Sequence, residues 1–194
     1  SDGVDASNAV MKAFESTEDE DPQTPLTHDL CWFRKGILLR EQGRAVAKDR
    51  GYLLQKSRDE LEELVFDVGE ETMLGMAAMF EMFQADEVEG KLDDAIDGYE
   101  GVIDSTKTVL DDERLDLANE VRERMVVMME SAYDRLARVL LDSGKADKVL
   151  ELGKAYRADL EKQGVPLTKF EGDKFTMGSE DARFGPLFYL TEAQ

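Results

Sequence analysis

Residues 27–43 read THDLCWFRKGILLREQG, and the helical periodicity of the chain begins in this stretch. Its apolar residues recur at spacings of three and four, which places them on two adjoining stripes of a helix. The first stripe holds Leu30, Phe33 and Ile37, and the second holds Trp32, Gly36 and Leu39. Thr27 is a suitable N-cap, and Gly43 is a typical residue for the end of a helix. The sequence therefore predicts an amphipathic helix from about residue 27 to residue 43.

The same periodicity continues along most of the chain. It predicts five further helices, at about residues 45–66, 70–85, 88–104, 111–142 and 146–162. Glycines such as Gly69 and Gly144 separate them, and the acidic turn at residues 111–113 suits the positive end of a helix dipole. Because the connections are short, consecutive helices are expected to pack as antiparallel hairpins. The predicted fold class is all-α.

Three stretches share a pattern of aromatic, small and apolar positions followed or preceded by a turn glycine. They read Trp32-x-x-Lys35-Gly36-x-x-Leu39-x-x-x-Gly43, Gly90-x-Leu92-x-x-Ala95-x-x-x-Tyr99-x-x-Val102, and Tyr133-x-x-Leu136-Ala137-x-x-Leu140-x-x-x-Gly144. This pattern resembles the tetratricopeptide repeat. The turn glycines lie 47 and 54 residues apart, whereas family repeats recur about every 34 residues. A plain helical bundle is the alternative to a short tetratricopeptide-like solenoid.

The resemblance implies both a packing rule and a binding face. Small residues, here Gly36, Ala95 and Ala137, would let two helices approach closely while a large residue fills the space opposite. The first helix of each pair would line a concave face that holds a peptide. The candidate partner-binding residues on that face are Arg34, Arg40, Glu81, Gln84, Arg135 and Arg138. Alternatively, Arg34, Arg135 and Arg138 form ion pairs along their own helices, with Glu41, Glu130 and Asp134 within reach.

The sequence divides into three parts. Residues 1–26 are expected to be a flexible acidic leader, residues 27–163 the helical domain, and residues 164–194 an extended tail. Within the tail, residues 169–175 predict a small hairpin, packed on the helices or leading into a second domain. The chain begins at Ser1 without Met, as expected of a processed or excised form. Its compartment is not indicated.

The charge narrows the class of partner. With 24 Lys plus Arg against 44 Asp plus Glu, the formal net charge is -20. Nucleic acid and anionic membrane surfaces need basic patches, so neither is expected as a partner. No apolar run is long enough to span a bilayer. The expected partner is a protein or peptide, and a basic one would be steered by this charge. A solubilising surface is the alternative explanation.

The residue types leave little room for catalysis or for a bound metal. The chain has one His and one Cys, His28 and Cys31, so it can form no internal disulfide and no multi-thiolate zinc site. It contains no phosphate-binding glycine loop, and its acidic runs lack the spacing of a calcium loop. No catalytic residue, cofactor or metal site is predicted, and the chain is not expected to be an enzyme by itself.

The leading function is therefore a non-catalytic scaffold module that binds a protein or peptide. Methionines recur every three residues at positions 73, 76, 79 and 82, where they line either the core or a groove. A second possibility is an accessory domain of a larger enzyme, because residues 166–190 weakly resemble the lead-in to a thioredoxin-like domain. A third is a structural oligomer that pairs through Trp32, Phe80 and Phe83, if these side chains are exposed.

Overall fold

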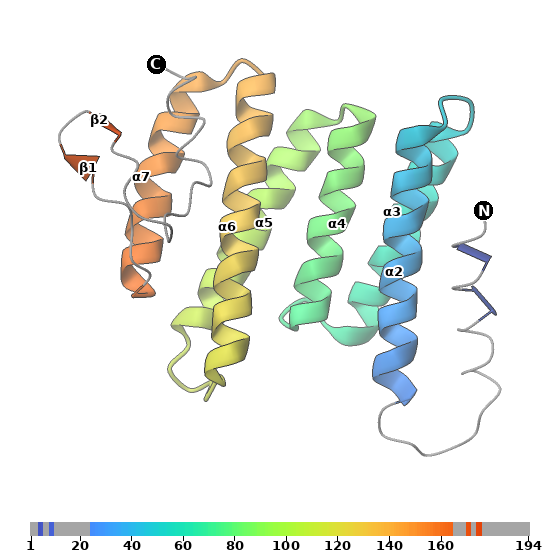
Figure 1. Ribbon diagram of the computed structural model, residues 1–194, viewed down its shortest axis with the longest axis horizontal. Helices are drawn as coiled ribbons and strands as arrows, with labels where there is room; N and C mark the ends of the chain where they lie inside the picture. The colour runs from blue at the N-terminus through green and yellow to red at the C-terminus, as the bar shows by residue number, and fades with distance from the viewer. Residues whose placement is uncertain (1–3, 6–7, 10–23, 165–169, 172–173, 176–194) are drawn as a thin grey trace. The chain divides into compact units, whose positions relative to one another are not determined.

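The computed structural model describes residues 4–5, 8–9, 24–164, 170–171 and 174–175. Residues 24–164 form helices joined by short connections, so the fold is all-α, as predicted (Figure 1). The helices are α2 (Thr24–Ala45), α3 (Arg50–Val68), α4 (Met73–Glu89), α5 (Leu92–Asp111), α6 (Asn119–Asp142) and α7 (Ala146–Lys162). By their contacts, the residues divide into two compact units, 1–98 and 99–194, so that α5 passes from one into the other.

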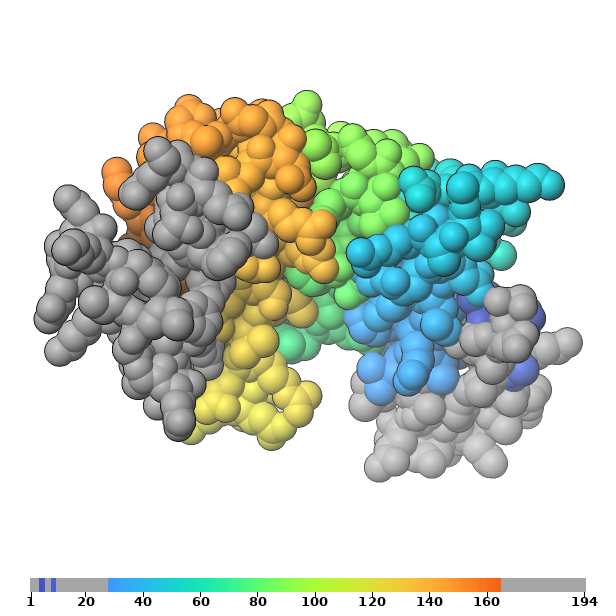
Figure 2. All heavy atoms as spheres, turned by 45° about the horizontal axis from the view of Figure 1, so that its top comes forward, coloured from blue at the N-terminus to red at the C-terminus, as the bar shows by residue number. Residues whose placement is uncertain are grey.

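In the first unit, α2 packs along α3 and α3 along α4 as successive antiparallel helices (Figure 1). The core of this unit holds the buried residues Leu61, Leu64, Val65 and Ala78. Trp32, Phe33, Leu74, Met79 and Met82 pack against them. Met76 is fully buried as well, so the methionine stripe contributes mainly to the core. The space-filling view shows the side chains of α2 and α3 lying against one another (Figure 2).

Two glycines of α2 permit its close approach to α3. A Cβ atom added at Gly36 would lie 2.5 Å from Cγ of Leu61, and the Ser57 hydroxyl donates a hydrogen bond to the Gly36 carbonyl at 2.8 Å. This confirms the expected small-against-large packing at Gly36. Gly43 was predicted to end its helix, but it does not. It lies inside α2, where an added Cβ would be 3.0 Å from Leu54, and the helix runs on to Ala45.

In the second unit, α6 packs on α7. The side chains of Tyr99, Tyr133, Tyr156, Met129, Leu136, Leu140 and Leu160 are almost completely buried. β1 (Phe170–Glu171) and β2 (Lys174–Phe175) pair antiparallel, with Phe170 opposite Phe175, which is the hairpin expected within residues 169–175. The remainder of the predicted tail and most of the predicted acidic leader lie outside the described residues.

Local hydrogen bonds set helix boundaries that differ from the predicted ones. The fifth predicted helix was expected to open at Asp111, but α5 ends there and α6 begins at Asn119. The Asp112 carboxylate accepts hydrogen bonds from the backbone N–H of Arg114 at 3.0 Å and from its Nε at 2.8 Å. Such a side-chain turn competes with helical hydrogen bonding. The N-cap of α4 is Thr72, whose hydroxyl accepts from the Gly75 N–H at 3.0 Å.

Candidate binding site on α2 and α3

A surface pocket of about 580 Å³ lies where α2 and α3 meet. We call it the α3 pocket, and its lining residues are Trp32, Asp59, Glu62, Glu63, Phe66 and Asp67. All except Trp32 belong to α3, at spacings of three and four residues, so they share one face of that helix. The pocket therefore combines two aromatic side chains with four carboxyl groups.

Phe66 is the most unusual member of this face. Its side chain is 93% exposed, whereas Leu64 and Val65 beside it in the sequence are buried in the core. Since α3 already buries its apolar stripe against α2 and α4, Phe66 has no place in that core. A large exposed aromatic residue beside a cavity is typical of a binding surface.

Trp32 is held in place as a wall of the α3 pocket. Its indole Nε1 donates a hydrogen bond to Oε2 of Glu60 at 2.9 Å, and Lys35 pairs with the other oxygen of Glu60 at 2.6 Å. The His28 ring packs edge-on against Trp32, with 5.7 Å between ring centroids. These contacts restrain the indole ring while leaving part of it accessible.

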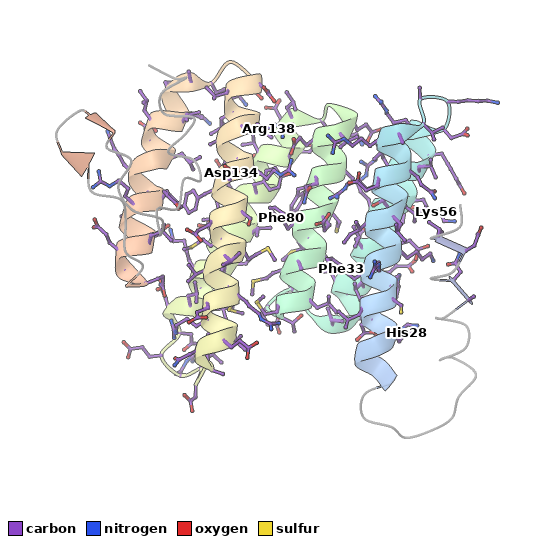
Figure 3. The ribbon with its side chains drawn as sticks, in the orientation of Figure 1. His28, Phe33, Lys56, Phe80, Asp134 and Arg138 are labelled. Carbon is purple, nitrogen blue, oxygen red and sulfur yellow. The ribbon has the colours of Figure 1, made fainter. Side chains whose placement is uncertain are left out.

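The four carboxyl groups make the α3 pocket strongly anionic at neutral pH. Asp59 accepts a hydrogen bond from Nε2 of Gln55 at 2.7 Å. Among the residues that the structure describes, Glu62, Glu63 and Asp67 form no ion pair. Lys56 lies one helical turn before Asp59 on α3 (Figure 3), but it is not part of the lining. The pocket thus presents carboxylates that no lining cation neutralises.

Three of the predicted partner-binding residues lie on adjacent helices of the first unit. Arg40, on α2, forms an ion pair with Glu81, on α4, and a second one with Glu41 at 2.8 Å. Arg40 and Gln84 are buried, and Glu81 is half-buried. The structure therefore brings Arg40 and Glu81 together in a contact between helices, and Arg40 also pairs with its neighbour Glu41 on α2.

The other three predicted residues lie on α2 and α6. Arg34 is exposed on α2. Arg135 is half-buried on α6, and Arg138, on the same helix, is exposed with its Nε 4.0 Å from Oδ2 of Asp142 (Figure 3). None of the six predicted residues lines the α3 pocket.

A second charged cluster joins α3 to α4. The buried Arg58 donates to Asp86 at 2.9 Å and pairs with Glu89 at 2.6 Å. Burial raises the pKa of Asp86 despite the nearby charge of Arg58. Burial acts in the same direction on Glu89, but hydrogen bonds from Lys91 and Arg58 hold the pKa of Glu89 below its ordinary value. Because its charged groups bond one another between two packed helices, this cluster is structural.

The described residues contain no cluster of metal ligands and no membrane-spanning helix. Across residues 24–164 and the other described positions, no three His, Cys, Asp or Glu side chains converge as metal ligands. No helix in this part of the chain has the length and hydropathy needed to cross a bilayer. The carboxylates of the α3 pocket are thus spread along a helix face and do not form a compact ion site.

The chain was compared with family models, with curated proteins and with solved structures, and none of them matches it. The tetratricopeptide resemblance therefore depends on the pattern of aromatic, small and apolar residues alone. Sequence reasoning missed the α3 pocket because it looked for polar residues on the first helix of each pair. The signal was present in the spacing of Asp59, Glu62, Glu63, Phe66 and Asp67, an acidic stripe interrupted by one aromatic residue.

Proposed function

We propose that the chain is a non-catalytic module that binds a segment of another protein, with the α3 pocket as the contact site. The observation that carries this proposal is Phe66, which is 93% exposed at the edge of a cavity. Covering an exposed phenylalanine contributes about 1.5–3 kcal/mol, and the restrained Trp32 offers a preformed wall beside it. Preformed walls reduce the entropy lost on binding.

The volume and chemistry of the α3 pocket support a peptide more than a large folded surface. A volume of about 580 Å³ lies within the range of pockets that bind small ligands, so the pocket can receive side chains of a peptide. The tetratricopeptide resemblance points in the same direction, because helical hairpin arrays typically hold peptides.

A displayed library of random peptides tests the proposal. The full chain serves as bait, alongside Phe66→Ala and the matched control Tyr52→Ala. Tyr52 is also an aromatic residue of α3, 69% exposed, and lies outside the pocket lining. We expect peptides that bind the unchanged chain and Tyr52→Ala but not Phe66→Ala. Peptides that bind all three proteins equally, or an absence of enriched peptides, would contradict the proposal.

A further inference from the structure

We propose that the α3 pocket receives an arginine side chain from a basic peptide segment. This inference deepens the proposed function and rests on it. It names the chemistry of the partner, which the exposure of Phe66 alone does not.

The first argument is charge complementarity. Of the six lining residues, four carry carboxyl groups and none is Lys or Arg. Asp59 and Glu63, like Glu63 and Asp67, stand four residues apart on α3, a spacing at which like charges repel. A cation placed among these carboxylates relieves that repulsion. The free energy of binding therefore includes the repulsion that is removed from the free protein.

The second argument is the pair of aromatic rings. The faces of Trp and Phe rings attract cations, and a guanidinium stacks on them while donating hydrogen bonds at its edge. An arginine between Trp32 and Phe66 can therefore contact both rings and reach carboxylates of α3. A lysine ammonium is a compact charge that does not stack, so arginine fits this lining better.

Other occupants fit the charges less well. A second copy of this chain carries the same formal net charge of -20, and an anionic surface opposes its approach. Nucleic acid and anionic lipid are repelled for the same reason. A divalent metal ion needs several converging ligands, which the described residues do not provide.

The fluorescence of Trp32 gives a direct measurement, because it is the only tryptophan in the chain. The probes are four short peptides that differ only at a central residue: arginine, lysine, citrulline or glutamate. Citrulline has the shape of arginine without its charge. We expect the arginine peptide to change the fluorescence in a saturable manner, with Kd at least tenfold lower than for the citrulline peptide. The lysine peptide should fall between them, and raising the NaCl concentration should weaken the arginine peptide most.

Variants of the full chain locate the binding. The double variant Glu62→Gln with Glu63→Gln should weaken binding of the arginine peptide several-fold and leave binding of the citrulline peptide unchanged. Phe66→Ala should weaken both peptides. The matched controls are Tyr52→Ala and Glu123→Gln, which replace an exposed aromatic and an exposed acidic residue outside the α3 pocket. Both controls should bind the arginine peptide like the unchanged chain.

The results separate this inference from the proposed function. If Phe66-dependent peptides bind equally well with arginine or citrulline, the arginine inference is wrong while the binding module stands. If no library peptide depends on Phe66, the proposed function itself fails. If Glu123→Gln weakens binding of the arginine peptide as much as the pocket variants do, the overall negative charge attracts the peptide and the inferred pocket site is wrong. Sedimentation that shows dimers lost in Phe66→Ala would assign the pocket to a second copy and overturn the inference.

Discussion

At the scale of single residues, one close contact between helices in the first unit depends on the missing side chain of Gly36. An added Cβ would lie 2.5 Å from Cγ and 2.6 Å from Cδ2 of Leu61, which is itself fully buried. Gly36→Ala should therefore lower the free energy of unfolding by about 1–3 kcal/mol, as overpacking does. Urea denaturation followed by circular dichroism measures this change.

Gly51 provides the matched control for Gly36. It is also helical, but it is exposed, and an added Cβ would meet no heavy atom within 4 Å. Gly51→Ala should raise the free energy of unfolding by about 0.4–1 kcal/mol, because alanine restricts the unfolded chain. Equal effects at the two positions would show that helix propensity, and not the approach of Leu61, governs both.

Asp86 predicts a pH dependence at the same scale. Its folded pKa is raised above 3.8 by burial, so the folded state holds a proton that the unfolded state has already released. The contribution of Asp86 to stability is therefore present at low pH and is lost as pH rises through its folded pKa. In Asp86→Asn this loss disappears.

Urea denaturation of both proteins between about pH 3 and pH 7 tests this sign. The stability of the unchanged chain relative to Asp86→Asn should fall as pH rises. Glu89, whose pKa is lowered, makes a contribution of the opposite sign that is present in both proteins. A difference that grows with pH would mean that the charge of Arg58 outweighs the burial of Asp86.

At the scale of the elements, two tyrosines join α6 to α7 in reciprocal fashion. Tyr133 on α6 donates to Asp159 on α7 at 2.5 Å, and Tyr156 on α7 donates to Glu130 on α6 at 3.2 Å. Their rings meet edge to face with 5.3 Å between centroids. Burial, together with the hydrogen bond to Asp159, raises the pKa of Tyr133, so this phenol remains a hydrogen-bond donor.

Replacing either tyrosine by phenylalanine keeps the ring and removes one bond. Tyr133→Phe should cost about 1.5–3 kcal/mol of stability, the range for a bond to a charged group, and should leave Asp159 paired with Lys107. Tyr156→Phe should cost about 0.5–1.5 kcal/mol, because its bond to Glu130 is longer. Urea denaturation of the two variants checks the order, and a larger loss for Tyr156→Phe would contradict it.

Periodicity was enough to predict the helices but not their ends. The spacing of apolar residues depends on the core face, which is visible in the sequence, as at Leu61, Leu64 and Val65. The end of α5 depends instead on a local competition in which the Asp112 carboxylate captures Arg114. Gly43 illustrates a different failure, because the same residue type serves as a helix stop or as a site of close approach.

The periodicity of apolar residues did not predict the α3 pocket, for a related reason. Phe66 belongs to the same apolar class as the core residues beside it, and only packing shows that it is left outside the core. The charges of Arg40 and Glu81 were visible, but their pairing across helices required the three-dimensional arrangement. Candidate residues chosen by type and position therefore included groups that the fold uses to hold its helices together.

At the scale of the whole molecule, the net charge of -20 opposes compaction of the chain. Added salt screens repulsion between exposed charges, whereas buried pairs such as Arg58 with Asp86 are screened much less. The melting temperature should therefore rise between low and moderate NaCl concentrations. A gain of about 1 kcal/mol corresponds to roughly 2–4 °C for a chain of this size.

Each acidic residue of the α3 pocket should contribute more to this repulsion than an average acidic residue, because the pocket carboxylates are crowded on one helix face. The triple variant Glu62→Gln, Glu63→Gln and Asp67→Asn removes three negative charges and no ion pair between described residues. At low salt it should melt at a higher temperature than the unchanged chain, and its melting temperature should rise less with NaCl. Calorimetry at two salt concentrations measures both effects.

A triple variant that is less stable at low salt would show that these carboxylates support the fold, and their presence would then need no ligand to explain it. Greater stability of the triple variant would mean that this charge cluster destabilises the folded chain. Residues selected for binding typically carry such a cost in stability.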